Sequence, residues 1–578
     1  MIPFVRRAVL IGLVAGLVVA HLSLVGLVVK LDDRDLITRL ISLGVMIPII
    51  TAFAAGYIAA GPRRDPETIE PSAATAVLSG AVGGLFTGLL VAAMTWLIDT
   101  VNVHGVLVNA SPKLVTTLHL GLDPLPGSLA LVFGAAGLGV LGAAIRVLPA
   151  AIRRGVLTGL VAVSGLALMQ TFVGQILTGL GLKAVNTFLY ARDGMNIAGA
   201  IVAVVAFAIA GWAWADRRDD VRQRFRSLGT AQKTSVRLVW LAIAVAILLT
   251  PPLYAGSFLS QALDLIGIYI LLGLGLNIVV GFAGLLDLGY VAFYAVGAYA
   301  TAVLTSPASP FFAPHINFWI AVPLVMAITA LIGLTIGAPV LRLRGDYLAI
   351  VTLGFGEIAR IIFLSDWMTP YVGGAQGILQ IPPPQIFGID LRQPERLYYP
   401  ILAACVIAAI AAISLARSRV GRAWTAMRED ESVAEASGVN TTKYKLLAFS
   451  LGATFGGLAG ALYAVRIGSV FPQDLNIIVS INALALIILG GIGSIPGVVV
   501  GAIVLVGLPE VLREFSEYRL LIYGIVLVAM MLLRPEGLLP NRSRRAELHK
   551  GEGEGEEGWD EAVWEREAGA ETPEPLIT

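Results

Sequence analysis

Residues 318–341 read FWIAVPLVMAITALIGLTIGAPVL and contain no charged side chain. A helix needs roughly 20 predominantly apolar residues to cross the hydrocarbon core of a bilayer, and this stretch is long enough. Similar windows recur almost from end to end, for example at residues 8–29, 73–98 and 398–416. A single hydrophobic anchor is therefore excluded, and we expect many membrane crossings.

The composition agrees with lipid as the main solvent. Hydrophobic residues make up 57% of the chain and charged residues 14%, with a mean hydropathy of +0.83, unlike a typical soluble domain. The apolar runs lack the alternation of barrel strands, so helices must satisfy the backbone in lipid. The expected fold class is an all-α polytopic transmembrane bundle of about 15–16 spans with soft boundaries. The 64 glycines suit close helix packing.

The predicted spans can be placed from these windows. They lie near residues 8–29, 36–60, 73–98, 125–148, 156–181, 194–215, 238–252, 258–282, 288–305, 318–341, 346–364, 398–416, 444–466, 476–490, 497–512 and 518–533.

Arginine and lysine are unevenly shared between the two sets of alternate connections. One set carries paired or clustered cations, and the other carries scattered ones such as Lys113 and Arg392. This asymmetry is the positive-inside pattern, which predicts that both termini are cytoplasmic. The apolar run after Arg6 and Arg7 is long, ends in no clear cleavage site and is followed at once by another span, so we expect an uncleaved first span. The connections with clustered cations contain Arg6, Arg7, Arg63, Arg64, Arg146, Arg153, Arg154, residues 217–237, Arg342, Arg344, residues 417–445 and residues 534–545.

Composition shifts suggest a division of the chain. A basic stretch, DRRDDVRQRFRSLGTAQKTSVR at residues 216–237, separates an N-terminal membrane module of about six helices from a second module at residues 238–540. Residues 541–578 are acidic and Gly-interrupted, which predicts a disordered cytoplasmic tail. Nothing in the first module, residues 1–215, suggests a function.

Several classes of site are missing from the sequence. No lysine stands in a phosphate-binding G-x-x-x-x-G-K-[ST] loop, so ATP hydrolysis would have to take place on another chain. The five histidines lack metal-ligand spacing, and Cys405 is the only cysteine, so we expect neither a metal site nor a disulfide. No catalytic cluster is recognisable. We therefore expect a protein that is not an enzyme, with no catalytic residues, no cofactor and no nucleic-acid partner.

The most specific stretch is a polar loop, GRAWTAMREDESVAEASGVNTTKYKLLAF, at residues 421–449. Residues 427–436 are long enough for a short helix, and Gly438 stands where a glycine after the last turn would end it. A helix lying across the cytoplasmic ends of the spans would offer a rigid contact to another protein. An ordinary amphipathic surface loop is the alternative.

Four further stretches occur in a fixed order with this loop. They are NIVVGFAGLLDLGYVAFYAVGAY at residues 277–299, LRLRGDYLAIVTLGFGEIARI at 341–361, VGGAQGI at 372–378 and ILGGIGSIPGVVVGA at 488–502, with the last span from Tyr518 following them. Together with the loop, they resemble the branched-chain amino acid permease family of binding-protein-dependent ABC importers. The resemblance covers about residues 240–540, so it assigns residues 238–540 as the permease core.

The resemblance implies roles for particular residues. The polar loop is similar to the coupling loop that docks on the ATPase in this family, so the contact would be made or shaped by Gly421, Arg422, Arg428, Glu429, Asp430, Glu435, Ala436 and Gly438. The segment VGGAQGI is similar to an outer-face segment, which makes Gly373, Gly374, Gln376 and Gly377 candidates for contact with substrate or binding protein. Val372 stands where the family often has threonine, which weakens the case for a polar contact there.

Glycines interrupt the helical pattern at two places within the membrane module. Interrupted helices at membrane depth are tolerated where they line a cavity or are covered by protein. A translocation path and close packing at glycine are about equally supported. The candidate path residues are Asn277, Gly281, Gly284, Gly289, Gly490, Gly491 and Gly493. Glu357 and Arg360, three residues apart on one helix face, are expected to form an internal ion pair that stabilises the bundle.

The family resemblance predicts a multi-pass inner-membrane permease subunit for branched-chain amino acids. Its expected partners are ABC ATPase subunits, a second permease subunit of the same family, an extracytoplasmic binding protein and the lipid bilayer. Relatives that carry urea or short amides leave the substrate open. An ion-coupled transporter using Asp264 and Asp287, or a membrane enzyme or scaffold built on the first module, would be the alternatives from other classes.

Overall fold

The structure is a computed structural model that describes most of the chain. The described residues are 2–38, 40–61, 72–101, 107–191, 194–227, 245–246, 248–254, 256–311, 313–340, 343, 345–511, 524–525, 528, 530, 532, 534 and 536–540. The expected acidic tail, residues 541–578, lies outside them, as does the second part of the basic linker. The chain divides into two compact units, Met1–Leu248 and Leu249–Thr578.

The first unit is helical apart from one small strand pair. Its strands β1 (Asp35–Ile37) and β2 (Ile41–Ser42) are antiparallel. The last helix continues through the start of the predicted linker to Ser227. The helices are α1 (Ile2–Leu24), α2 (Leu27–Leu31), α3 (Leu43–Ala59), α4 (Ala73–Thr100), α5 (Pro112–Leu118), α6 (Pro124–Val147), α7 (Ala150–Leu168), α8 (Gln170–Gly179), α9 (Lys183–Leu189) and α10 (Ile197–Ser227).

The second unit is a larger bundle with interrupted helices. Two residue pairs form its small antiparallel sheet, β3 (Gln385–Ile386) and β4 (Ile389–Asp390). The helices are α12 (Pro251–Tyr254), α13 (Gly256–Leu276), η2 (Asn277–Phe282), α14 (Val291–Thr305), α15 (Phe318–Val340), α16 (Asp346–Leu364), α17 (Thr369–Val372), η3 (Gly374–Gln376), α18 (Pro394–Arg417), α19 (Arg419–Glu429), α20 (Glu431–Ala436), α21 (Thr441–Ile467), η4 (Pro472–Asp474), α22 (Ile477–Gly490), α23 (Ile495–Ala502), η5 (Ile503–Gly507) and α24 (Leu508–Val511).

The all-α polytopic class is confirmed. Within the described residues, 11 helices are long and apolar enough to cross a membrane, and Leu43–Ala59, Val291–Thr305 and Ile495–Glu510 form shorter apolar helices. This is fewer full-length spans than the sequence suggested. The window at 156–181 is divided between α7 and α8 at Met169, and the windows at 238–252 and 518–533 lie largely outside the described residues.

Small residues bring helices into backbone contact, as expected where lipid gives no hydrophobic drive to associate. In the first unit, a Cβ on Gly84 would lie 2.9 Å from the carbonyl carbon of Ala135, so α4 and α6 touch there. In the second unit, Gly297 on α14 faces Gly457 on α21 with a similar backbone approach. The core of the second unit forms around these contacts, with Leu271, Phe449 and Ala459 almost fully buried.

Arginines gather at one end of the first unit. Arg7 Nη1, near the start of α1, donates to the Gly61 carbonyl just after α3 at 3.0 Å. Arg146 Nη1, at the end of α6, donates to the Tyr57 hydroxyl of α3 at 3.0 Å, and Arg153 Nη1 reaches the Arg146 carbonyl at 3.1 Å. The cations of successive predicted cytoplasmic connections thus share one end of this helix bundle.

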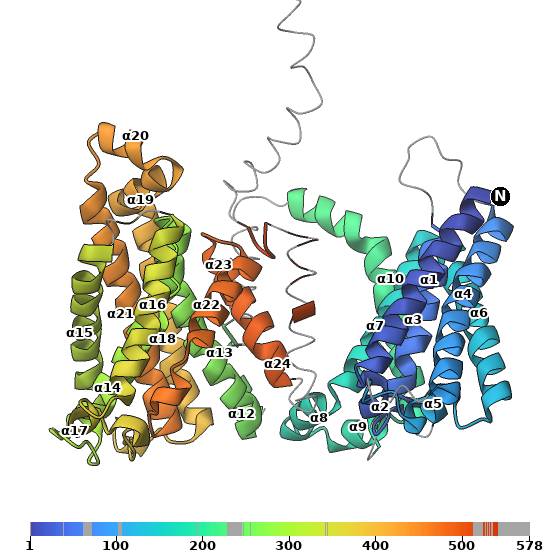
Figure 1. Cartoon of the computed structure of the whole chain (residues 1–578), viewed down its shortest axis with the longest axis horizontal. Coiled ribbons are helices and arrows are strands. Elements are labelled where there is room, and N and C mark those ends of the chain that lie inside the picture. The colour runs from blue at the N-terminus through green and yellow to red at the C-terminus, as the bar shows by residue number, and fades with distance from the viewer. Residues whose placement is uncertain are drawn as a thin grey trace, which may run out of the picture. The chain divides into compact units, whose positions relative to one another are not determined.

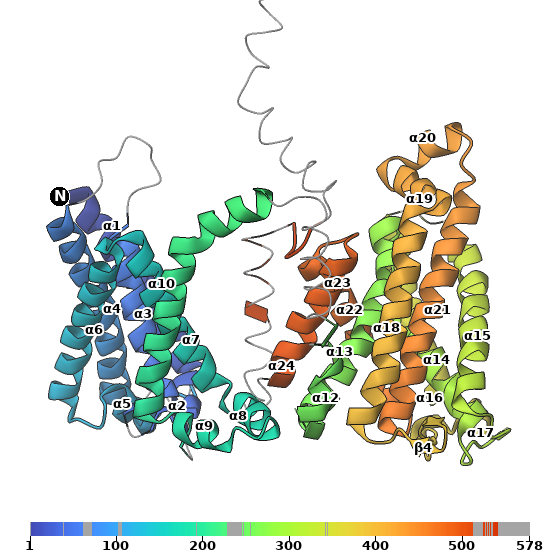
Figure 2. The ribbon, with the colours of Figure 1, turned by 180° about the vertical axis from the view of Figure 1, so that it is seen from behind.

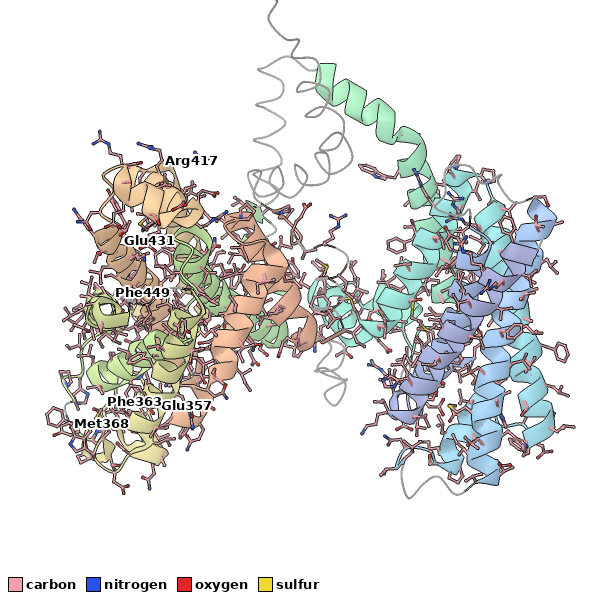
Figure 3. The ribbon with its side chains drawn as sticks, turned by 45° about the horizontal axis from the view of Figure 1, so that its top comes forward. Glu357, Phe363, Met368, Arg417, Glu431 and Phe449 are labelled. Carbon is pink, nitrogen blue, oxygen red and sulfur yellow. The ribbon has the colours of Figure 1, made fainter. Side chains whose placement is uncertain are left out.

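The second unit has two different ends. The short helices α19 and α20 lie together at one end of the bundle, and α17 lies at the opposite end (Figure 1). The view from behind shows the same separation, with β4 beside α17 (Figure 2). Arg417 and Glu431 mark the first end and Met368 the second (Figure 3). The polar loop and the VGGAQGI segment therefore occupy opposite faces of one bundle.

This separation gives a topology prediction. In a Cys405→Ala background, Ser437→Cys beside α20 and Gln385→Cys in β3 place single exposed thiols at the two ends. We expect a membrane-impermeant maleimide to label the thiol at position 385 in intact spheroplasts and the thiol at position 437 only after permeabilisation, because the end with the arginines should face the cytoplasm. Labelling at position 437 from outside would invert the topology.

Candidate functional site

The polar loop between α18 and α21 folds into two capped helices. Ser418 Oγ caps α19 by accepting from the Val420 amide at 3.1 Å. Asp430 Oδ1 caps α20 by accepting from the amides of Ser432 and Val433 at 2.8 and 3.0 Å. The expected single helix over 427–436 is therefore wrong in its bounds, because Asp430 is extended and ends α19 before it begins α20.

Gly438 ends α20 with a left-handed backbone. Its φ is +89°, its amide donates to the Glu435 carbonyl at 2.9 Å, and the Val439 amide donates to the Ala434 carbonyl at 3.0 Å. These two bonds form a Schellman motif, which normally requires glycine at this position. The next helix begins two residues later, where Asn440 Oδ1 accepts from the Lys443 amide at 3.0 Å. Gly438 thus determines how sharply the chain turns back into α21.

Buried side chains fix α19 and α20 to the bundle. Trp424 is fully buried, and its indole Nε1 donates to the Tyr444 carbonyl at 2.8 Å. Lys445 Nζ pairs with Glu431 Oε1 at 2.6 Å, and the lysine side chain is almost fully enclosed. Gly421 lies directly on the last carbonyls of α18, where a Cβ would collide with the Ala416 carbonyl. The loop is therefore packed on the spans through buried side chains and does not extend freely into solvent.

The outward side of the two helices carries a mixed polar and apolar surface. Glu429, Glu435 and Ala436 are exposed, as is Arg422. Val433 is 61% exposed, so α20 presents a large apolar side chain on its outward side. Sequence analysis missed Val433 and Trp424. The spacing of Gly421, Trp424 and Met427 along one helix face would have located the buried side of α19.

Arg428 points into the bundle instead of outward with its neighbours. Its Nη1 donates to the Gly281 carbonyl at 2.9 Å, and a Cβ on Gly284, whose φ is +72°, would lie 2.7 Å from Arg428 Cγ. Glu429 lies 3.9 Å from the guanidinium on the solvent side. Arg428 thus joins α19 to a segment about 150 residues earlier in the chain.

The segment that Arg428 contacts is the first of the two helix interruptions predicted from the glycines. Helix α13 widens into the π-helical η2 at Asn277 and stops at Ala283, and α14 begins at Val291. π-helical turns inside spans are uncommon and occur frequently at functional sites. The last carbonyls of a helix have no amide partner in a following turn. The Arg428 side chain donates to one of these carbonyls, that of Gly281.

The second interruption meets the first. Helix α22 ends at Gly490, Gly491 and Gly493 have φ values of +117° and +79°, and Ser494 caps α23. Asn277 Oδ1 accepts from the Gly493 amide at 2.9 Å, with both groups buried. A Cβ on Gly493 would also lie 3.5 Å from Arg428 Nη1. The structure therefore brings Asn277, Gly281, Gly284, Gly493 and Arg428 together.

Other candidates lie away from this cluster. The backbone of Gly289 packs on α16 at Thr352, and Gly490 packs on Gly497 at the start of α23. The amides of Leu538 and Leu539 donate to the carbonyls of Leu489 and Gly490 at 2.8 and 2.9 Å. These glycines serve close packing beside the cluster.

The VGGAQGI segment forms a tight turn at the other end of the bundle. Gly373, Gly374 and Gly377 all have positive φ values, and Ile378 pairs with Val470 through two backbone bonds of 3.0 and 2.9 Å. Val372 is buried, which fits its apolar character, and Gln376 is exposed. The turn presents Gln376 on the face opposite α20, so it belongs to a separate site.

The two carboxylates of the ion-coupled alternative are both buried. Asp264 lies within α13, where neither of its oxygens has a hydrogen-bond partner. Asp287 lies in the connection before α14, and its Oδ1 accepts from the Gly289 amide at 2.9 Å. Neither carboxylate contacts the polar loop.

Comparison with known proteins identifies relatives of the second unit. The family model described as the branched-chain amino acid transport system permease component matches residues 258–533. The high-affinity branched-chain amino acid transport system permease protein LivM of Salmonella typhimurium is 42% identical over 313 residues, covering 50% of this chain and 72% of that protein. The Escherichia coli LivM protein gives the same identity and coverage.

A shorter match is found with the permease protein LivH of Escherichia coli, which is 34% identical over 125 residues, covering 21% of this chain and 40% of LivH. No solved structure matches the chain significantly. The family-model match leaves residues 1–257 uncovered.

The glycine at the end of α20 gives a prediction about the loop itself. A β-branched residue at a φ of +89° costs about 1–2 kcal/mol in backbone strain, while asparagine tolerates this region. A Cβ at position 438 would meet no other atom within 4 Å, so strain alone should act. We expect Gly438→Val to raise the rate of trypsin cleavage after Lys443 roughly 5–30-fold.

Gly438→Asn is the matched control for this change, and its cleavage rate should remain within about threefold of the unchanged chain. Equal cleavage rates for the valine and asparagine variants would show that the turn does not depend on a left-handed residue.

Proposed function

The chain belongs to the family of branched-chain amino acid transport system permease components, and we propose that its second unit forms half of an importer path for these amino acids. It is a permease subunit of an ABC transporter in the cell membrane, not an enzyme, and it works beside a partner permease subunit. ATP is hydrolysed on separate subunits.

The observation that carries the proposal is the rigid connection from α20 to the interrupted helices. A surface that docks on an ATPase must keep its position on the bundle when the ATPase moves. The buried Trp424 and the Lys445–Glu431 pair hold α19 and α20 in this position. Transmission requires a contact from this surface to the path, and the Arg428–Gly281 bond supplies it. An ion-coupled transporter would need neither feature.

The residues of α19, α20 and the turn after α20 divide into three roles. Val433, Glu435 and Ala436 are proposed to contact the ATPase, with Val433 filling an apolar depression and Glu435 at the rim. Asp430 and Gly438 shape the element, because their groups are used in capping α20. Arg428 transmits the movement of the element to the spans.

Transport then follows an alternating-access scheme. Two ATPases that close on ATP would move α20 of each permease subunit, and Arg428 would carry this movement to η2 and the turn at 491–494. A binding protein would deliver the substrate to the opposite end, near the VGGAQGI turn, where Gln376 is exposed. We propose residues 238–540 as the permease core, residues 1–215 as an additional membrane module, residues 216–237 as the linker and residues 541–578 as a tail.

Uptake by the purified complex tests this function. The chain would be reconstituted in liposomes with its partner permease, ATPases and binding protein, and radiolabelled leucine would be supplied outside. We expect ATP-dependent accumulation that is inhibited by excess isoleucine or valine and not by excess urea or acetamide. Inhibition by urea or acetamide alone would assign the path to another small solute, and accumulation driven by an ion gradient without ATP would contradict the ABC mechanism.

Arg428 gives the sharpest test of transmission. Arg428→Met keeps the aliphatic packing on Gly284 and removes the donor to the Gly281 carbonyl, a charge-assisted bond worth about 1.5–3 kcal/mol. We expect the amount of leucine transported per ATP hydrolysed to fall about tenfold or more, while ATPase co-purification stays within about twofold of normal.

Arg422→Met is the matched control, because Arg422 is an exposed arginine on the same helix, and its side chain donates only one long bond, 3.5 Å to the Arg417 carbonyl, within the described part of the chain. It should leave the transport ratio unchanged. If both variants transport normally, Arg428 has no part in transmission.

A further inference from the structure

Helix α16 has one face that the second unit leaves uncovered. Leu348, Ala349, Thr352 and Gly356 are buried against the bundle. The other side of the helix, which follows an i, i+3, i+4 spacing, points away from the unit. This outward face consists of Tyr347, Ile350, Val351, Gly354, Glu357, Ile358, Ile361 and Ile362.

An ion pair lies at the edge of this outward face, where Glu357 belongs to the face and Arg360 lies next to it. Arg360 Nε donates to Glu357 Oε1 at 2.9 Å, and the two side chains are 28% and 40% exposed. Figure 3 labels Glu357 and Phe363 on this helix. The sequence led us to expect an internal pair that stabilises the bundle. The pair does form, but its exposure on the surface of the unit corrects the expected location.

The pair lies at membrane depth. At 1.5 Å per residue, Glu357 lies about 15 Å along the helix from Tyr347 and about 10 Å from Leu364, the ends of a span of 18 residues. A charged residue facing lipid at such a depth costs about 2.5–3.5 kcal/mol, and such residues therefore face protein or a water-filled cavity. The α16 face is thus unsuited to lipid.

Two other spans of this unit have exposed sides of a different composition. The exposed large residues of α18 include Val406, Ile407 and Ile410, and those of α15 include Ile320 and Leu331. No charged residue interrupts either of these apolar surfaces in the middle of its span. The contrast between the ion pair on α16 and the isoleucine and leucine side chains on α15 and α18 favours a more polar environment for α16.

Helix α16 is also joined to the segment that Arg428 holds. The Leu288 amide donates to Thr352 Oγ1 at 3.0 Å, and Gly289 packs directly on the Thr352 backbone. Residues 284–289 therefore form a short bridge from the Arg428 contact to the buried side of α16. Any movement transmitted by Arg428 would reach this helix within a few residues.

We propose that the outward face of α16 borders the water-filled substrate path and that the second permease subunit closes this path from the opposite side. The inference rests on the proposed importer function, because the path of a two-subunit permease lies between its subunits. Water in the path would solvate the Glu357–Arg360 pair and the isoleucines beside it, and the partner subunit would form the opposite wall of the path. The pair would then mark the depth at which the two subunits separate during transport.

Cysteine accessibility tests this location. In a Cys405→Ala background of the assembled complex, Ile358→Cys and Ile361→Cys place thiols on the α16 face, and Ile407→Cys and Ile410→Cys place matched thiols on α18. We expect a charged, water-soluble methanethiosulfonate to modify the α16 thiols at least about tenfold faster, because ionised thiolates form in water and not in lipid. Saturating leucine with the binding protein and ATP should alter the α16 rates and leave the α18 rates unchanged.

Cross-linking identifies the subunit opposite α16. A short bifunctional thiol reagent should join the α16 thiols to single cysteines in the partner permease and give a heterodimer band. A homodimer band would assign the face to a second copy of this chain and overturn the proposed partner. Slow modification of α16, equal to that of α18, would overturn the path location.

Thiol labelling can be measured without transport, so it tests the location of α16 independently of the importer function. Normal leucine uptake with unreactive α16 thiols would leave the importer function intact and remove this inference. Loss of ATP-dependent uptake in the unchanged complex would instead remove the proposed function. Assembly of each variant, checked by co-purification of all subunits, ensures that unreactive thiols reflect location and not misfolding.

Discussion

Every backbone amide and carbonyl that lies in lipid must find its hydrogen-bond partner within the protein. Two interrupted helices in the second unit break the regular pattern, and each leaves groups that its own helix cannot satisfy. Asn277 accepts from the Gly493 amide, and Arg428 donates to the Gly281 carbonyl. A residue of the first interruption therefore supplies a hydrogen-bond partner to the second, and both interruptions lie against Arg428 from the polar loop. The rest of the unit depends on this arrangement, because it is where the spans, the glycine turns and the loop meet.

Under the proposed function, the same constraint connects a short surface element to the inside of a membrane bundle. The helices α19 and α20 are tied down by Trp424 and by the Lys445–Glu431 pair, so a force on α20 is not lost in loop bending. Among the described residues, Arg428 is the only side chain of this element that donates a hydrogen bond to η2. A break in that bond would leave a carbonyl at a helix end without its partner, which gives the contact two distinct states with different free energies. Transmission by a discrete contact is more plausible physically than continuous bending of a packed core.

Sequence analysis predicted much of this architecture, because its signals are local. Apolar length gives the spans, glycine and proline give the interruptions, and the spacing from Arg428 to Gly438 gives a loop with helical content. The misses concern direction in space. Arg428 and Glu429 are neighbours in a charged run, yet one points inward and the other outward. Glu357 and Arg360 form the expected pair, but it is partly exposed at the edge of the uncovered face of α16 and does not lie inside the bundle. Which face of a span meets protein, water or lipid depends on neighbours distant in the chain, and the single Asp430 that divides α19 from α20 could be recognised only once its cap bonds were visible.

Hydrogen exchange on the assembled complex measures the central claim most directly, namely that ATP binding to the ATPase subunits docked on α20 changes the interruptions through Arg428. The amides of residues 281–285 and 491–494 would be followed with and without ATP, in the unchanged chain and in Arg428→Met. The Gly493 amide is a buried donor to Asn277, so its protection reports the contact itself. We predict that ATP alters exchange in α20 and in both interruptions of the unchanged chain, and in α20 alone when Arg428 is replaced. Equal changes in the interruptions of both chains would contradict the account.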